Sequence, residues 1–444
     1  MLILYSFVLL VLLTLSAPWW LVRMATSGKY REGLTERLGV VPRSRLGDLD
    51  GRKIVWVHAV SVGEVLAASR LIDELGTRLT QAGAQEGSDP WRVMLSTTTR
   101  TGQTLARQKF GADRVFYFPL DLGWAVRSWL RALRPQLLVL AETEFWPGML
   151  AACRREKIPV AVVNARISDR SWPRYRRLAW IWRRLLRSLA VVLAQSDLDA
   201  ERLRALGAAN VRVAGNLKYD VRAAGSSKAT ALLRENLPPG GRVLVCGSTL
   251  AGEEALLLDA LPADAVTILA PRHPERFAEV AELLRKRSAK FVRRSEWVDA
   301  PNPLAPGTVF LLDSIGELAS VYSLAHAAFI GGSLVPTGGH NPLEAAQFGV
   351  PVAMGPSYEN FRGIVEKLRE HHAIRIVQPG EVRAALAELL SGTAAAIAMG
   401  ARSREVFESE SGATGRSVQA LLELIEASEP GAAERQRMAE EVRA

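Results

Sequence analysis

The stretch from Ser333 to Pro356, SLVPTGGHNPLEAAQFGVPVAMGP, has the composition of a phosphate-binding loop that leads into a helix. Gly338 and Gly339 let the backbone approach a ligand closely, and Pro342 suits the first turn of a helix, where no N–H group is needed. The amides and the positive end of the helix dipole would then face an anion. Helix starts that bind nothing can have the same composition, so the motif alone does not decide between the two.

Acidic residues follow two apolar runs in the first half of the chain. Glu64 comes shortly after the run Lys53–His58, where a carboxylate can serve as a general base. Ser61 and Glu64 also have the spacing of a capping box, and for that pattern alone the capping interpretation is the more favoured one. Glu142 and Glu144 come directly after the run Gln136–Ala141. Pairing with a nearby arginine, such as Arg166 or Arg170, is the simpler explanation of their charge.

In the second half of the chain, Arg272 stands between two prolines after an apolar run. A stiffly held arginine can recognise a phosphate or a base, although a plain surface turn remains an alternative. Glu317 and Glu344 are expected near the same sheet edge. Carboxylates beside a phosphate are costly unless they bind hydroxyl or amine groups. These acids therefore favour a nucleotide over bare phosphate.

The elements that position these residues alternate between apolar runs and amphipathic stretches, which predicts an α/β fold with parallel sheets. Two series of such units predict two doubly wound, Rossmann-like domains, with ligands at strand carboxyl ends on facing edges of a cleft. We place the domains at residues 23–220 and 221–429, followed by a polar tail at 430–444. Residues 81–90 are expected to form a surface insertion.

Residues 1–22 carry no charged side chain and end in Pro18, Trp19 and Trp20, with basic residues following. This is roughly the ~20 residues that a bilayer-crossing helix needs, and it predicts a membrane anchor with the domains on the cytosolic side. A cleaved signal peptide is the competing interpretation, but the segment lacks a basic start. A monotopic, half-inserted helix is a variant of the anchor.

The chain has a net charge of +10, which favours a polyanionic partner. Residues 154–187 hold eleven lysines and arginines against two acids, interleaved with Trp172, Trp180 and Trp182. Behind an anchor this pattern favours an anionic membrane surface over nucleic acid, and a solvated helix face is the plain alternative. Cys153 and Cys246 are far apart, which gives no disulfide framework or zinc site.

Seven motifs in order carry a resemblance to a known family: HAVSVGE, ETEFWP, NARIS, GNLKYD, APRHPERF, DSIGEL and GGSLVPTGGHNPLEAA. With the amino-terminal anchor, the chain resembles the bacterial 3-deoxy-D-manno-octulosonic acid (Kdo) transferases of lipopolysaccharide synthesis. The resemblance implies a GT-B glycosyltransferase, inverting, metal-independent and without a cofactor, at the cytoplasmic side of the inner membrane. It further implies transfer of Kdo from CMP-Kdo to the 6′-hydroxyl of the lipid A precursor (lipid IVA).

The resemblance also implies roles for individual residues. Glu64 is similar to the family's general base, while Glu142 and Lys218 match positions that stabilise the transition state. The segments similar to the family's CMP contacts are Pro271, Arg272, Ile315, Gly316, Glu317, Asn341, Pro342, Leu343 and Glu344. The alternatives are another membrane-associated GT-B transferase, a sugar-nucleotide epimerase, or an anchored protein that binds anionic lipid without catalysis.

Overall fold

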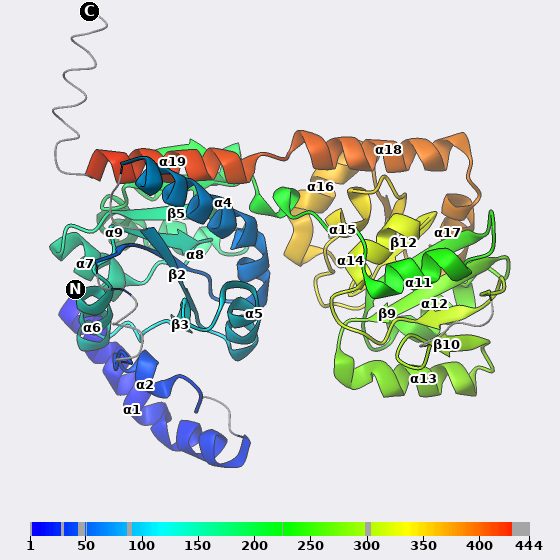
Figure 1. Ribbon diagram of the computed structural model, residues 1–444, viewed down its shortest axis with the longest axis horizontal. Helices are drawn as coiled ribbons and strands as arrows, with labels where there is room; N and C mark the ends of the chain where they lie inside the picture. The colour runs from blue at the N-terminus through cyan, green and yellow to red at the C-terminus, as the bar shows by residue number, and fades with distance from the viewer. Residues whose placement is uncertain are drawn as a thin grey trace, which may run out of the picture. The chain divides into compact units, whose positions relative to one another are not determined.

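The computed structural model describes residues 2–27, 31–42, 49, 51–86, 91–223, 225–297 and 303–428. The chain forms two compact units (Figure 1). Unit 1 consists of Met1–Val221 and Ser411–Ala444, and unit 2 consists of Arg222–Glu410. Each unit is built on a seven-stranded sheet in which every pair of neighbouring strands is parallel.

The sheet of unit 1 has the order β3-β2-β1-β4-β5-β6-β7. Successive residues of its central strands pack on opposite faces, so that Val55 joins one core cluster and Trp56 the other. Both faces are covered, which explains why these strands are continuous apolar runs in the sequence. The strands are β1 (Lys53–His58), β2 (Trp91–Thr97), β3 (Val115–Tyr117), β4 (Leu137–Ala141), β5 (Val160–Ala165), β6 (Val191–Ala194) and β7 (Val211–Val213).

The helices of unit 1 include an amino-terminal apolar helix, α1 (Leu2–Ser27), in which Tyr5–Thr26 is long and apolar enough to cross a membrane. The others are α2 (Leu34–Arg37), α4 (Val62–Glu86), α5 (Arg100–Phe110), α6 (Gly123–Leu133), α7 (Pro147–Arg155), α8 (Trp172–Arg177), α9 (Ala179–Leu186), α10 (Asp197–Ala205), the 3-10 helix η2 (Leu217–Asp220) and α19 (Ala413–Ser428).

The sheet of unit 2 has the order β10-β11-β9-β8-β12-β13-β14. Its strands are β8 (Arg242–Thr249), β9 (Ala265–Pro271), β10 (Phe291–Arg293), β11 (Val309–Leu311), β12 (Ala327–Ile330), β13 (Val352–Met354) and β14 (Arg375–Ile376). Its α-helices are α11 (Lys228–Asn236), α12 (Glu253–Ala260), α13 (Phe277–Lys286), α14 (Leu318–Val321), α15 (Leu343–Ala346), α16 (Arg362–Glu370), α17 (Val382–Leu390) and α18 (Ala394–Ser409). The 3-10 helices are η3 (Pro274–Arg276), η4 (Tyr322–Leu324), η5 (Glu359–Phe361) and η6 (Pro379–Glu381).

The placement of α19 differs from the predicted second domain at 221–429, because the chain returns to unit 1 at Ser411. Figure 1 shows α19 lying along α4, and Leu421 and Ile425 join the core cluster that contains Leu71. The buried carboxylate of Asp220 accepts hydrogen bonds from the N–H groups of Gly412 and Thr414, which caps the start of α19. An apolar helix face and a buried cap therefore fix α19 to the first sheet.

The insertion predicted at residues 81–90 is also corrected in part. Residues 81–86 continue the long helix α4, and residues 87–90 lie outside the described residues. The predicted polar tail at 430–444 lies outside them as well.

Candidate active site

Glu64 and Glu142 lie at the point where the strand order of unit 1 reverses. The strand β1 pairs with β2 on one side and β4 on the other, and Glu64 and Glu142 follow β1 and β4. In open parallel sheets, ligands bind outside the carboxyl ends of strands at such a switch point. The first sheet thus brings two of the predicted site residues to the edge where a ligand is expected.

The Glu64 carboxylate is held by hydrogen bonds from the residues just before its helix. Oε2 accepts from the Val60 N–H at 2.8 Å, and Oε1 accepts from the Ser61 hydroxyl at 3.0 Å. The Val60 carbonyl in turn accepts from the N–H groups of Thr98 and Thr99, both at 3.1 Å. Glu64 thus contacts Ser61 at the predicted spacing, but its carboxylate accepts from the N–H of Val60 rather than from that of Ser61, so the bonds differ from those of a capping box. The same contact fixes its carboxylate in one position at the sheet edge.

The electrostatic surroundings of Glu64 suit a base that works near neutral pH. Its carboxyl group is partly buried, and burial is the main reason that its pKa rises to about 7. The negative charges of Glu142 and Glu144 raise this pKa further, whereas the hydrogen bonds from Val60 and Ser61 lower it. A general base is most effective when its pKa lies near the working pH.

Glu142 and Glu144 provide two more carboxylates beside Glu64. Glu142 has a φ of 57°, in the left-handed region that is uncommon for residues other than glycine and that is often found at functional sites. Burial and the charge of Glu142 raise the pKa of Glu144. Among the described residues, neither carboxylate forms an ion pair or hydrogen bond, so pairing with Arg166 or Arg170 does not explain them.

Lys218 reaches the same cluster from η2. Burial lowers its pKa, the charge of Arg166 acts in the same direction, and the carboxylates of Glu142 and Glu64 oppose them. The buried Asn164 positions this turn, because its Oδ1 accepts from the Leu217 N–H at 3.0 Å. Asn164 has a φ of 55° and lies at a register shift between β5 and β6, a feature that re-aims side chains near active sites.

The switch point of unit 2 lies between β8 and β12, and the glycine-rich loop follows β12. The backbones after these two strands approach so closely that a Cβ on Gly331 would lie 2.5 Å from the Ser248 carbonyl oxygen. The buried carboxylate of Glu253 accepts hydrogen bonds from the N–H groups of Gly332, Ser333 and Leu334 at 2.7 to 2.8 Å. A protein carboxylate, rather than a ligand, thus holds the first amides of this loop.

The later part of the loop differs from the predicted helix start. Helix α15 has only four residues, and its Leu343 N–H is capped by Asn341 Oδ1 at 3.1 Å. The Gly338 N–H donates to the Ser357 hydroxyl, and the Gly339 N–H donates to the Gly332 carbonyl. Both glycines have a positive φ, so this turn requires glycine at those positions. An anion at this loop would therefore meet few unused amides and would depend on nearby cations.

Arg272 is a cation that lies near this loop and could neutralise such an anion. Its exposed side chain follows β9, and its charge lowers the pKa values of both His340 and Glu344. Burial is the larger cause for His340 and leaves it neutral, with a pKa of about 4. Burial raises the pKa of Glu344 to about 7, against the effect of Arg272. Arg272, His340 and Glu344 of unit 2 thus lie near one another at the glycine-rich loop.

The Ile315-Gly316-Glu317 turn lies on the next strand connection. Glu317 accepts hydrogen bonds from the Ala229 N–H and the Ser314 hydroxyl, and it pairs with Arg294 at 3.2 Å. These contacts outweigh burial and lower its pKa. The carboxylate therefore ties the turn to the start of α11. The Ile315 side chain, by contrast, is 78% exposed at the tip of the turn.

The basic stretch predicted at 154–187 forms a surface on α7, α8 and α9. A hollow of about 510 Å³ is lined there by Arg154, Trp180, Arg183, Arg184, Arg187 and Ser188. None of its four arginines pairs with a carboxylate of the described residues, and Trp180 is 69% exposed. We call this feature the arginine hollow.

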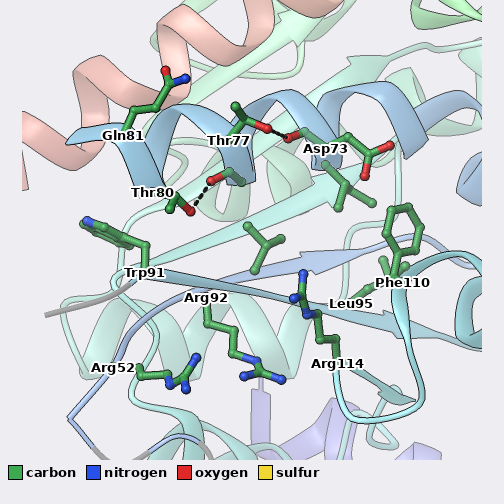
Figure 2. A pocket seen from close by; sticks show the side chains of 13 residues that line it. Arg52, Asp73, Thr77, Thr80, Gln81, Trp91, Arg92, Leu95, Phe110 and Arg114 are labelled. Atoms are coloured by element: carbon green, nitrogen blue, oxygen red, sulfur yellow. Dashed lines mark hydrogen bonds between the residues drawn. The ribbon is translucent and has the colours of Figure 1, made fainter. Parts of the chain in front are cut away.

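Figure 2 shows a different hollow, of about 580 Å³, between α4 and β2. Arg52, Arg92 and Arg114 lie on one side of it, and the hydroxyls of Thr77 and Thr80 donate to carbonyls of their own helix. None of the predicted site residues lines this hollow. Within the described residues, no group of three or more His, Cys, Asp or Glu side chains is arranged to hold a metal ion.

Two parallel-sheet units of this kind define the GT-B fold of glycosyltransferases. The crystal structure of MurG from Acinetobacter baumannii agrees, with a TM-score of 0.52 and 15% identity over 84% of this chain and 99% of that chain. The predicted fold class is therefore confirmed.

The comparisons with known sequences are more specific. The family model described as 3-Deoxy-D-manno-octulosonic-acid transferase (kdotransferase) matches residues 32–221. A 3-deoxy-D-manno-octulosonic acid transferase of Haemophilus influenzae is 33% identical over 78% of this chain and 79% of its own length. Another, of Bordetella pertussis, is 34% identical over 83% of this chain and 86% of its own length. The chain belongs to the family of 3-deoxy-D-manno-octulosonic acid transferases, as the seven motifs indicated.

Proposed function

We propose that this protein transfers Kdo from CMP-Kdo to the 6′-hydroxyl of the lipid A precursor, with inversion and without a metal ion or cofactor. Membership of the Kdo transferase family supports Kdo transfer in lipopolysaccharide synthesis. The donor, the acceptor and the roles of individual residues are our proposal. The observation that carries the mechanism is the partly buried Glu64 carboxylate, with a pKa of about 7, at the switch point of the first sheet.

Glu64 is the general base in this mechanism. The acceptor hydroxyl gives its proton to the Glu64 carboxylate while its oxygen bonds to the anomeric carbon of Kdo. The bond between that carbon and the CMP phosphate breaks, and CMP leaves with the electron pair. Base catalysis of this kind contributes roughly 10²- to 10⁴-fold in rate.

Glu142 and Lys218 supply opposite charges beside the base. A carboxylate favours the positive charge that develops on the sugar, and an ammonium group favours negative charge on the departing phosphate. The electrostatic influence of Glu142 and Glu64 on Lys218 supports a shared site for these three residues.

We infer that CMP binds unit 2 beside the glycine-rich loop. Arg272 would neutralise the phosphate, and Glu344, which is adjacent to Arg272, would accept from hydroxyl or amine groups of the nucleoside. The remaining predicted contacts are Pro271, the Ile315 to Glu317 turn, and Asn341 to Leu343. Because Glu317 is engaged within the protein, we expect it to shape the turn rather than to leave its partners for the ligand.

A nucleotide panel tests the donor. Calorimetry should detect binding of CMP and much weaker binding of UMP, UDP and CDP. Arg272→Ala should weaken CMP binding by at least about tenfold, the effect expected for loss of one charge-assisted contact of about 1.5–3 kcal/mol. Arg285→Ala is the matched control, because Arg285 lies on α13 and pairs with Glu282. Preference for a uridine nucleotide would favour another GT-B transferase or an epimerase.

We further propose that the protein is attached to the cytoplasmic face of the inner membrane. The apolar helix α1 and the arginine hollow support this location. A variant with Arg183, Arg184 and Arg187 changed to Ser should bind anionic vesicles less tightly than the wild type at low salt. The difference should shrink at high salt, where headgroup attraction is screened. Equal binding of both proteins at low salt would contradict a role for the hollow.

A further inference from the structure

The amino-terminal end of α1 is hydrogen-bonded to unit 1. Tyr5 donates its hydroxyl to Asp121 Oδ2 at 2.9 Å. Asp121 is 2% exposed, and its carboxylate also accepts from the N–H groups of Gly148 and Met149, both at 2.7 Å. The helix therefore contacts a carboxylate that already caps α7. Figure 1 shows the beginning of α1 beside α6 and α7.

The chain that follows α1 is fixed to the same unit. The Glu36 carboxylate in α2 accepts from the Tyr117 N–H at 2.7 Å, and the Trp129 indole N–H donates to the Glu36 carbonyl at 2.8 Å. Gly33 packs so tightly on the Tyr117 ring that a Cβ there would overlap it. Both ends of α1 are thus attached to unit 1, one directly and one through α2.

This double attachment is not compatible with a helix that crosses the bilayer. The 26 residues of α1 span about 39 Å at 1.5 Å per residue, and the hydrocarbon core is about 30 Å thick. A crossing helix that begins on the side of α2 would carry Tyr5 to the opposite side, out of reach of Asp121. The Tyr5–Asp121 hydrogen bond therefore requires that the helix run along the protein.

The pattern of burial along α1 also indicates that the helix runs along the protein. Half-buried positions recur at helical spacing along the helix, at Tyr5, Leu9, Leu13, Ser16, Trp20 and Met24. The large apolar residues of its other faces are exposed, at Phe7, Val8, Leu10, Val11, Leu12, Leu15, Trp19, Leu21 and Val22. An exposed apolar surface of this length marks a site of contact with a membrane or with another protein. The arginine hollow on the same unit carries positive charge that complements anionic lipid, so we infer that the exposed face of α1 contacts a bilayer.

We propose that α1 is a monotopic membrane element, lying in the interface of the bilayer along unit 1, with both of its ends on the side of the globular units. The inference rests on the membrane attachment proposed above and adds its geometry. It means that the membrane holds unit 1 by the length of a helix rather than by a single flexible connection.

The test is the topology of the full-length protein in bacterial membranes. A short protease-sensitive tag is joined before Met1, and a second protein carries the same tag within the loop at Ser226 of unit 2 as a control. In intact spheroplasts both tags should resist added protease, and in inverted vesicles both should be digested. Digestion of only the amino-terminal tag in spheroplasts would overturn the monotopic arrangement while leaving membrane attachment intact. Recovery of the protein in the soluble fraction would instead overturn the attachment itself.

A double-mutant cycle tests the docking contact independently. Tyr5→Phe and Asp121→Asn should each lower the unfolding temperature of the detergent-solubilised protein, and their effects should be less than additive because they share one hydrogen bond. Leu12→Ala, at an exposed position of the same helix, is the control and should be additive with Asp121→Asn. Additive effects of Tyr5→Phe and Asp121→Asn would refute the docking.

Discussion

The role of Glu64 leads to the most specific prediction, because the structure supplies both its position and its pKa. Glu64→Gln keeps the shape of the side chain and an oxygen that can accept one of the hydrogen bonds from Val60 and Ser61. It removes the ability to accept a proton. We expect kcat to fall by at least about a hundredfold, with CMP affinity unchanged.

The pKa of about 7 gives the expected pH dependence. The base works when it is deprotonated, which applies to about a tenth of molecules at pH 6, about half at pH 7 and about nine tenths at pH 8. The value of kcat/KM should therefore rise about fivefold from pH 6 to pH 7 and less than twofold from pH 7 to pH 8. The residual activity of Glu64→Gln should lack this rise.

Two neighbouring substitutions should move the rise in opposite directions. Glu144→Gln removes a negative charge that raises the pKa of Glu64, so the rise should shift to lower pH. Ser61→Ala removes a hydrogen bond that lowers this pKa, so the rise should shift to higher pH while the maximum rate stays similar. The assay is the initial rate of CMP release at subsaturating donor. Near-normal turnover of Glu64→Gln, or a pH profile that it shares with the wild type, would return Glu64 to a capping role alone.

Further predictions concern stability, metal and the supporting residues. Because the folded pKa of Glu64 lies above its ordinary value of 4.5, the wild type should lose unfolding free energy relative to Glu64→Gln as pH rises from 5 to 8, measured by urea titration. Activity should survive exhaustive EDTA treatment, and loss with rescue by magnesium would contradict the proposed metal independence. Glu253→Gln should lower the unfolding free energy by about 1.5–3 kcal/mol and weaken CMP binding, whereas unchanged CMP affinity would contradict its role in holding the loop. Asn164→Gly keeps the left-handed backbone but leaves the Leu217 N–H without its acceptor, so the turn that carries Lys218 should be held less firmly. We expect kcat to fall while CMP affinity stays constant, and a wild-type kcat would refute this positioning role.

The strands and the first candidate site follow directly from the sequence. Parallel strands that are buried on both faces are continuous apolar runs, so Lys53–His58 and the run ending at Ala141 could be recognised without a structure. The polar residues after such runs lie at one edge of the sheet, which places Glu64 and Glu142 near each other. The structure agrees with that placement.

Other features depend on contacts between distant residues and could not be predicted. An amphipathic pattern shows that α19 has an apolar face but not which sheet it covers, and Asp220 caps it from almost two hundred residues earlier. Glu253 belongs to none of the sequence motifs, yet its carboxylate accepts hydrogen bonds from three N–H groups of a loop about eighty residues later. The short length of α15 could not be predicted either, because the preceding turn at Gly338 and Gly339 is closed by hydrogen bonds to Ser357 and Gly332.

The most direct test of the proposed function is the mass of the reaction product. Purified full-length protein is incubated with CMP-Kdo and the lipid A precursor in detergent micelles, with Glu64→Gln as the matched control. We predict that the glycolipid gains the mass of one or more Kdo residues and that CMP appears in equal amount, both lost in the control. Consumption of CMP-Kdo without a heavier glycolipid, or a heavier product formed equally by Glu64→Gln, would contradict the account.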